Sequence, residues 1–360
     1  MSLRGANLRT SVEAGPGAQA ESTRASEDAG ECNLRQSRAM GPMQVAARAP
    51  GVSRMAVAIV NWNTRDLLRA CLTSCLAERP EEIVVVDNGS YDGSIDMMRR
   101  EFPNVRLKVL PANPGYGAAS NIAFRLCTAP HVLLLNSDTE VRPGALGALA
   151  RALDERPRTG VIGPKLENPD GSLQRSVFAF PSPYISFLKR QPLSSLVTRL
   201  PGLREHYPLN FAHDRERRVP WVLGAAQAIR REAFDAVGGF DESFVMYFEE
   251  VDLCYRMRRA GWDTRFLPVA TVMHVGGAAT RQRRQEMLVR LTLSSLEFHR
   301  HHDRGARLAL ARQVVRMSAR AWLWRDTLRY WLSRSLPRRE RLAQDREVWR
   351  EVLTRTSTGP

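Results

Sequence analysis

The chain has 360 residues, enough for one large or two ordinary domains with a buried core. It carries 53 Lys and Arg against 38 Asp and Glu, and this formal net charge of +15 indicates an anionic partner. Five scattered cysteines argue against a disulfide framework and favour a reducing, cytosolic location, and neither a spanning apolar run nor a signal-peptide core is present.

Residues 1–54 are rich in Ala, Gly, Ser, Arg and Glu and show no sustained periodicity, so we expect a disordered leader there. A strand–helix alternation begins at Met55. Residues 56–60 and 83–86 are continuous apolar runs, and the apolar residues between 67 and 76 recur at helical spacing. Strands that are apolar on both faces predict an α/β fold with a mostly parallel sheet flanked by helices.

Two further strands are predicted at residues 105–110 and 132–135, with a helix of small residues ending near residue 126 between them. Polar and glycine residues follow the strands in three segments, at residues 87–90, 113–117 and 136–139. Ligands bind at the carboxyl ends of the strands in open α/β sheets, so these segments are expected to meet at a ligand site.

The second half of the pattern is less regular. It predicts a helix over 142–155, strands at 161–165 and 173–178, a helix over 231–237, an acidic helix after Phe248, and strands at 264–267 and 271–274. Residues 180–219 have no period, and a connection of that length is more often a functional loop than filler.

The last eighty residues are predicted to form a basic, amphipathic helical tail. Between residues 281 and 360 there are 19 Arg, no Lys and 8 acidic residues. One apolar stripe recurs at spacings of four and three, through Leu310, Val314, Met317, Ala321, Trp324, Leu328 and Trp331. The pattern fits a helix packed on the domain and equally a helix lying on an anionic membrane surface. His299, His301 and His302 are interpreted as surface residues.

Three polar groups could carry chemistry, and each has an ordinary structural interpretation as well. Asp87 after the second strand could bind a base or ribose, or belong to a helix cap. Asp138 at the fourth strand end could hold a hard divalent cation, or close a turn. His274 follows an apolar strand and would be a ligand only if partner residues lie beside it.

Glu249, Glu250 and Asp252 form an acidic cluster directly after an aromatic run. Burying such a cluster is costly unless a metal, a base function or an Arg stabilises it. On a helix, Glu249 and Asp252 share a face with Arg256, and Asp252 pairs with Arg256 at i,i+4. Glu250 points about 100° away and can face a different partner. One acid is thus free to act as a base.

Taken together, the motifs resemble the family 2 glycosyltransferases of the GT-A fold, near their rhamnosyltransferase-like members. The resemblance spans residues 56–280 and rests on motifs that recur in this order, at residues 59–64, 86–90, 113–121, 135–139, 221–225, 238–242 and 247–256, ending at His274. It implies a GT-A domain over 55–280, which lies between the leader predicted over 1–54 and the helical tail predicted over 281–360.

The resemblance also implies roles for single residues. Glu250 inherits the base role, where the family usually has Asp; Glu249 remains an alternative base, and Asp252 completes the catalytic set. Asp138 and His274 would bind Mg²⁺ or Mn²⁺. The donor-binding set is Asn61, Asn63, Asp87, Asn88, Gly89, Asn113, Gly117, Asn121 and Asn136, and the acceptor or sugar pocket is Trp221, Gly224 and Ala225.

The implied activity is inverting transfer of a sugar, with rhamnose as the family-level expectation, from a nucleotide-diphosphate donor. The acceptor would be a hydroxyl of a glycan or polyprenyl-linked glycan in cell-surface polysaccharide synthesis. We expect a cytoplasmic enzyme whose tail is a candidate to hold the inner face of the membrane, with no nucleic-acid partner. The alternatives are a nucleotidyltransferase and a non-catalytic basic surface-binding protein.

Overall fold

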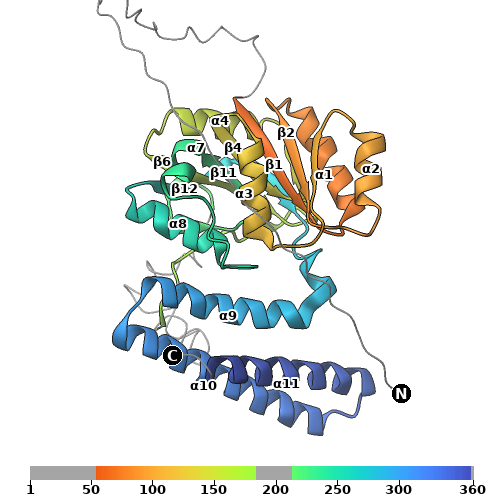
Figure 1. The fold of residues 1–360 in the computed structure, drawn as a ribbon, viewed down its shortest axis with the longest axis vertical. Coiled ribbons are helices and arrows are strands. Elements are labelled where there is room, and N and C mark those ends of the chain that lie inside the picture. Colours follow the sequence, from red (N-terminus) through yellow and green to blue (C-terminus); the bar gives the residue numbers. More distant parts are fainter. Residues whose placement is uncertain (1–53, 184–212, 358–360) are drawn as a thin grey trace, which may run out of the picture. The chain divides into compact units, whose positions relative to one another are not determined.

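The computed structural model describes residues 54–183 and 213–357 (Figure 1). The leader predicted over 1–54 lies almost wholly outside the described residues, as does most of the irregular connection predicted over 180–219.

A ten-stranded sheet forms the centre of the described chain, in the order β3-β2-β1-β4-β11-β6-β12-β5, with β7 paired to β6 and β9 to β12. Its strands are β1 (Met55–Asn61), β2 (Ile83–Asp87), β3 (Arg106–Val109), β4 (His131–Asn136), β5 (Thr139–Val141), β6 (Thr159–Glu167), β7 (Leu173–Gln174), β9 (Arg217–Arg218), β11 (Ala226–Arg230) and β12 (Asp263–His274). The strands from β3 to β4 are parallel, and so are β6 and β12, whereas β11 runs antiparallel to both of its neighbours. A separate two-stranded sheet pairs β8 (Val177–Phe178) with β10 (Trp221–Val222).

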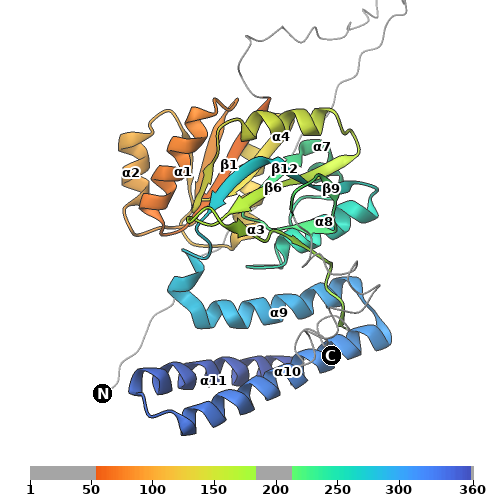
Figure 2. The same cartoon turned by 180° about the vertical axis from the view of Figure 1, so that it is seen from behind.

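Helices cover both faces of the large sheet (Figures 1 and 2). One face packs on α1 (Arg65–Ala77), α2 (Ser94–Glu101) and α4 (Ala145–Asp154), and the other on α3 (Tyr116–Leu126), α7 (Arg231–Ala236) and α8 (Glu249–Arg259). Along β1, Val57 and Ile59 join the first core while Ala56 and Ala58 join the second. Both sides of the strand are therefore buried, which explains its continuous apolar sequence. The predicted fold class is confirmed.

Three parts of the second half differ from the predicted elements. A short strand, β5, precedes α4, so that helix begins at Ala145 and not at residue 142. The two strands predicted at 264–267 and 271–274 are one strand, β12, whose register shifts between Leu267 and Thr271 around Pro268. Proline has no backbone N–H to donate to the neighbouring strand. The strand pairing is therefore interrupted at Pro268, although the strand continues beyond it. The strand predicted at 173–178 divides into β7 and β8, and β11 was not predicted.

The carboxyl ends of the parallel strands are in register. Asn61 at the end of β1 pairs with Asp87 at the end of β2, and Val60 pairs with Asn136 at the end of β4. The polar segments that follow these strands therefore start at one edge of the sheet, as expected for an open α/β fold.

The predicted tail is helical and consists of η2 (Thr280–Arg283), α9 (Arg284–His302), α10 (Gly305–Leu332) and α11 (Leu336–Ser357). Val315 and Ala319 of α10 pack with Val289 of α9 and with Val348 and Val352 of α11. The predicted apolar stripe lies mostly on another side of α10, because five of its seven members are exposed: Met317, Ala321, Trp324, Leu328 and Trp331. No helix among the described residues is long and apolar enough to span a membrane.

Candidate active site

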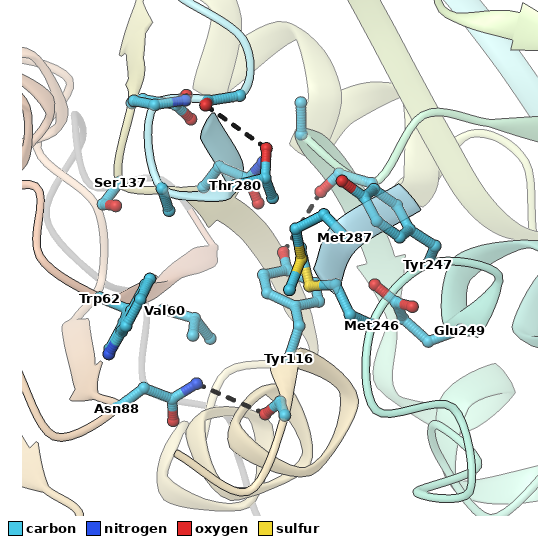
Figure 3. A pocket seen from close by; sticks show the side chains of 18 of the residues that line it. Val60, Trp62, Asn88, Tyr116, Ser137, Met246, Tyr247, Glu249, Thr280 and Met287 are labelled. Carbon is cyan, nitrogen blue, oxygen red and sulfur yellow. Dashed lines mark hydrogen bonds between the residues drawn. The ribbon is translucent and has the colours of Figure 1, made fainter. Parts of the chain in front are cut away.

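A cavity of about 390 Å³ opens at the carboxyl edge of the sheet (Figure 3). Trp62 and Asn88 lie on one side of it, Tyr247 and Glu249 on the other, and Tyr116 and Met287 project between them. The cavity thus draws its walls from the ends of β1, β2 and β4, from the start of α8 and from α9.

Three of the predicted donor residues, Asn88, Asn113 and Asn136, line this cavity. The Asn88 side-chain amide donates to Asn113 Oδ1 at 3.3 Å and to the Gly115 carbonyl at 3.4 Å. Asn88 Oδ1 is buried and has no hydrogen-bond partner. A buried unpaired acceptor is costly, so a ligand donor group that pairs with it would be favoured here.

The structure places Asn61 and Asp87 behind the cavity wall. Asn61 Nδ2 donates to Asp87 Oδ2 at 2.8 Å, and Asp87 Oδ1 accepts the Ser90 amide at 2.8 Å. Both side chains are almost fully buried. Asn63 likewise accepts the Tyr91 amide, and Gly89 has a positive φ of 76°. These residues shape the loop that carries Asn88 and do not themselves line the cavity.

Gly117 and Asn121 lie on α3, away from the cavity lining. Asn121 donates to the Phe240 carbonyl and accepts the Phe240 amide, both at 2.9 Å. It therefore ties the loop before α8 to α3. A Cβ added to Gly117 would lie 3.6 Å from Glu249 Cβ, which is an ordinary packing distance. Their donor-binding role stays a prediction, and the contacts seen here are structural.

Gly115 is the glycine on which the cavity wall depends most. Its φ is +107°, a conformation that L side chains rarely adopt, and an added Cβ would lie 2.5 Å from the Val245 carbonyl oxygen. The Tyr116 amide donates to that same carbonyl at 3.0 Å. This close approach brings the loop before α8 against the start of α3, so that Val245, Met246 and Tyr247 line the cavity.

Asp138 and His274 meet at the cavity, with 3.3 Å between Asp138 Oδ1 and His274 Nε2. Gln174 donates its Nε2 to the His274 carbonyl, which leaves Gln174 Oε1 to accept from His274 Nδ1 at 2.7 Å. The hydrogen-bond network thus assigns the proton to Nδ1 and turns Nε2 toward Asp138. Burial raises the pKa of the Asp138 carboxyl, but the charged form of the His274 ring, in which Nε2 also carries a proton, and the Ala278 amide outweigh burial and hold this pKa below its ordinary value.

This arrangement fits a divalent cation. A histidine whose second nitrogen is oriented by an amide oxygen, beside an ionised carboxylate, is a common ligand pair with its outer-shell support. His274 Nε2 is buried without a hydrogen-bond partner, which suits it to bind a metal. No third His, Cys, Asp or Glu joins them among the described residues, so a cation would take its other ligands from outside this set.

Glu249 and Glu250 both line the cavity, from the first turn of α8. Burial, and then the charge of Glu250, raise the pKa of Glu249 well above its ordinary value. Burial also raises the pKa of Glu250, but backbone amides, including that of Gly224, oppose the rise. Of the two acids, Glu249 is therefore the one that retains its proton more readily, and Glu250 is the one that ionises first.

The raised pKa of Glu249 predicts a pH-dependent stability. The folded state holds this proton more tightly than the unfolded chain, so the stability is fully present below the ordinary pKa of 4.5 and is lost as the pH rises through the raised folded value. Glu249→Gln should therefore raise Tm near neutral pH and leave it unchanged near pH 4. Thermal melts across that range check this. Glu101→Gln is a control of opposite sign, because Arg69 lowers the pKa of the exposed Glu101. A lower Tm of Glu249→Gln at neutral pH would contradict the argument.

Asp252 does not reach the cavity. It is fully buried and accepts Arg256 Nε at 2.6 Å, the predicted i,i+4 pair, and His302 Nε2 at 2.7 Å. Glu249 and Asp252 were expected to share a helix face, but they meet different surroundings. Glu249 is the first residue of α8 and lines the cavity, whereas Asp252 is buried beside Arg256 and His302. The interpretation of the histidines as surface residues is wrong for His299 and His302, which are both largely buried; His302 contacts Asp252 of α8, and His299 contacts Asp303.

The predicted sugar pocket divides in the same way. Gly224 and Ala225 line the cavity, and an added Cβ on Gly224 would lie 3.5 Å from the Glu250 side chain. Tyr116 Oη donates to the Gly224 carbonyl at 3.3 Å. Trp221 lies outside the lining, stacked on Phe178 at 4.7 Å and donating to the Ala179 carbonyl.

Sequence reasoning missed the cavity residues that come from the tail. Arg283, Glu286, Met287 and Arg290 all line the cavity, and Arg283 lies over the Trp62 ring at 4.9 Å. Their spacing of three and four predicts that they share one face of a helix, but the sequence does not show which part of the protein that face contacts. Gln174 and Tyr116 were also assigned no role, and a single Gln in a short strand carries no signal of its own.

A sheet whose parallel strands share one carboxyl edge, a cation-compatible Asp–His pair and two buried glutamates suit a sugar-transferring enzyme. Comparison with known proteins shows that this class is correct: the chain is a glycosyltransferase. The family model described as "Glycosyltransferase like family 2" matches residues 50–291, and the chain belongs to this family. The nucleotidyltransferase and the non-catalytic alternatives are therefore set aside.

Individual relatives and one solved structure are similar to this chain. The N-acetylglucosaminyl-diphospho-decaprenol L-rhamnosyltransferase of Mycobacterium tuberculosis is 36% identical over 212 residues, which cover 56% of this chain and 68% of that protein. The O-antigen biosynthesis protein RfbC of Myxococcus xanthus is 28% identical over 295 residues, covering 77% of this chain and 21% of that protein. The solved mannosyltransferase PcManGT from Pyrobaculum calidifontis, in complex with GDP-Man and Mn²⁺, aligns with a TM-score of 0.45 and 18% identity over 88% of each chain. The family model and the rhamnosyltransferase confirm the predicted family resemblance.

Proposed function

We propose that this glycosyltransferase moves a deoxysugar, with rhamnose as the first candidate, from a nucleotide-diphosphate donor to a hydroxyl of a polyprenyl-linked glycan. The observation that carries the proposal is the cavity that joins Asp138 and His274 to Glu249 and Glu250. The rhamnosyltransferase similarity at 36% identity supports the choice of sugar and acceptor class.

The proposed reaction is a single displacement with inversion. The acceptor hydroxyl gives its proton to the Glu250 carboxylate while its oxygen forms a bond to the anomeric carbon. The bond from that carbon to the diphosphate oxygen breaks, and the nucleoside diphosphate leaves with the electron pair. A general base works best when its pKa is near the working pH, and the raised pKa of Glu250 moves it in that direction.

Glu250 is the better candidate for the base, and Glu249 for a neutral neighbour. Gly224 has no side chain to pack against Glu250. Its backbone amide also favours the charged form of the Glu250 carboxyl. A protonated Glu249 at the same cavity wall can donate a hydrogen bond, whereas an ionised carboxylate can only accept one. We therefore propose Glu250 as the base and keep Glu249 as the alternative that mutation can test.

Asp138 and His274 would hold Mg²⁺ or Mn²⁺, with Gln174 orienting the His274 ring. Such a cation stabilises charge that develops on a diphosphate leaving group. Asn88 and Asn113 would contact the nucleotide, because both line the cavity and Asn88 Oδ1 lacks a partner.

The acceptor side of the cavity would be formed by Gly224, Ala225 and the residues of α9. A polyprenyl-linked acceptor is held in a membrane, so we propose that the enzyme acts at the inner face of the cell membrane without spanning it. No nucleic-acid partner is proposed.

A donor screen tests this function. Purified protein is incubated with nucleotide sugars and a diphosphate-linked acceptor analogue, with and without Mg²⁺ or Mn²⁺, and release of nucleoside diphosphate is measured. We expect release from a deoxythymidine-diphosphate deoxysugar that requires both the acceptor and the metal. Release from another donor alone would overturn the choice of sugar, and equal release with chelator would overturn the role of the metal.

A further inference from the structure

One side of α10 carries large apolar side chains that no other described element covers. The exposed fractions are 45% for Met317, 69% for Trp324, 44% for Leu328, 71% for Trp331 and 72% for Leu332. We call these five residues the apolar face of α10. Single exposed apolar residues are ordinary, but a row that contains two widely exposed tryptophans indicates an interaction surface.

The helix does not need this face for its own packing. Residues 317, 324, 328 and 331 follow one another at spacings that place them on one side of a helix. Ala311, Val315 and Ala319 are buried on another side, where α10 meets α9 and α11. α10 therefore packs on α9 and α11 through one of its sides, and no element of the described chain packs on the apolar face.

Positive charge surrounds the apolar face. Residues 305–341 contain ten Arg and only two acidic residues, Asp326 and Glu340. Asp326 is fully buried and accepts from Arg325 and from Trp349 Nε1, so it does not offset charge at the surface. Arg320, Arg329 and Arg334 are exposed, and no carboxylate within ion-pair distance is found for them among the described residues.

This combination favours a lipid surface over a second copy of the chain. A symmetric pair would bring the same arginines toward one another, and such like-charge contacts cost free energy. Anionic headgroups instead complement the arginines, and Trp is enriched where headgroups meet acyl chains because its ring is apolar with one polar N–H. Helices with this pattern lie in the membrane interface without crossing it.

We propose that the apolar face of α10 binds the surface of an anionic phospholipid bilayer, with Trp324 and Trp331 entering the interface and the neighbouring arginines contacting lipid phosphates. The inference deepens the proposed function, on which its biological purpose rests. α10 packs on α9, and α9 supplies Met287 and Arg290 to the cavity, so binding through α10 would keep the cavity close to a membrane-held acceptor.

Vesicle flotation of the full chain tests the proposal without any sugar. Vesicles of phosphatidylcholine with about one third phosphatidylglycerol are compared with vesicles of phosphatidylcholine alone. We expect binding to the anionic vesicles that weakens with salt. Trp324→Glu/Trp331→Glu should lower the partition coefficient at least tenfold. Arg320→Gln/Arg329→Gln/Arg334→Gln should lower it about fivefold for each arginine, on anionic vesicles only.

Val269→Glu is the matched control, since Val269 is 74% exposed on β12 and lies outside the face. It should bind vesicles like the wild type. Transfer to a water-soluble acceptor analogue should be unchanged in all these variants, so loss of vesicle binding is separable from loss of the proposed activity. Leu332→Glu repeats the test should the double Trp variant fail to fold.

Two outcomes would overturn the proposal. In the first, the double Trp variant binds anionic vesicles as well as the wild type. In the second, sedimentation velocity shows a wild-type dimer that the double Trp variant converts to monomer, while neither protein binds vesicles. That result would assign the apolar face to a second copy of the chain.

Discussion

Glu250→Gln should reduce sugar transfer by about 10²–10⁴-fold while donor binding stays near the wild-type value. The substitution keeps the shape of the side chain and its place beside Gly224 but removes the group that accepts the acceptor proton. The rate is measured as release of nucleoside diphosphate in the presence of acceptor, and donor binding is measured by calorimetry in its absence. A loss of rate without a loss of binding places the effect on the chemical step.

Glu249→Gln is the matched control, because the two glutamates share the first turn of α8 and both line the cavity. If Glu249 is the protonated member of the pair, Gln resembles its working form, and we expect less than a tenfold change in rate. The pH dependence adds an independent readout. The wild-type rate should rise as Glu250 ionises, and Glu250→Gln should lose that limb of the profile. Full turnover in Glu250→Gln with loss in Glu249→Gln would reverse the assignment.

Asp138→Asn should abolish the dependence of donor binding on Mg²⁺ or Mn²⁺. An amide at this position has no negative charge for the cation, although it keeps a similar size and can still meet the Ala278 amide. Mn²⁺ titration of the protein alone, followed by calorimetry, measures the effect apart from activity. The expected loss of metal affinity exceeds the ~10–100-fold that outer-shell partners typically supply.

Gln174→Leu should give the smaller, ~10–100-fold loss that is typical of an outer-shell partner, because it releases the His274 ring without removing a ligand. Gln174→Glu retains an acceptor for His274 Nδ1 and should restore most of the metal affinity. Asp96→Asn, an exposed carboxylate on α2, is the control and should behave like the wild type. An unchanged Mn²⁺ titration in Asp138→Asn would remove Asp138 from the site.

Local sequence patterns predicted the central strands of the sheet and the polar segments that follow them. The apolar runs that became β1, β2 and β4 are buried on both faces, and such strands have a signature that does not depend on distant residues. The chain pattern was less informative for β12, where Pro268 interrupts one strand, and for β5, which has only three residues. Short or interrupted strands form through pairing with neighbours that the local sequence does not reveal.

The site was predicted as a set of residue types, and the tertiary structure decided which of them face the cavity. Asp87 and Asp138 each follow a strand and look alike in the sequence, yet Asp87 is held by Asn61 behind the wall while Asp138 lies beside His274. Asp252 follows the two glutamates in α8, but its carboxylate is paired with His302 of α9 and does not line the cavity.

The sequence by itself determined the family, the fold class, the strand ends that carry polar groups and the amphipathic character of the tail. These depend on periodicity and on motifs within short stretches. Only the tertiary structure decided that Gln174 orients His274, that α9 closes one side of the cavity, and that α10 packs through one face and exposes the tryptophans of another. Each of these facts is a contact between segments far apart in the chain, and the direction of a side chain toward such a partner is set by packing and not by its own neighbours in sequence.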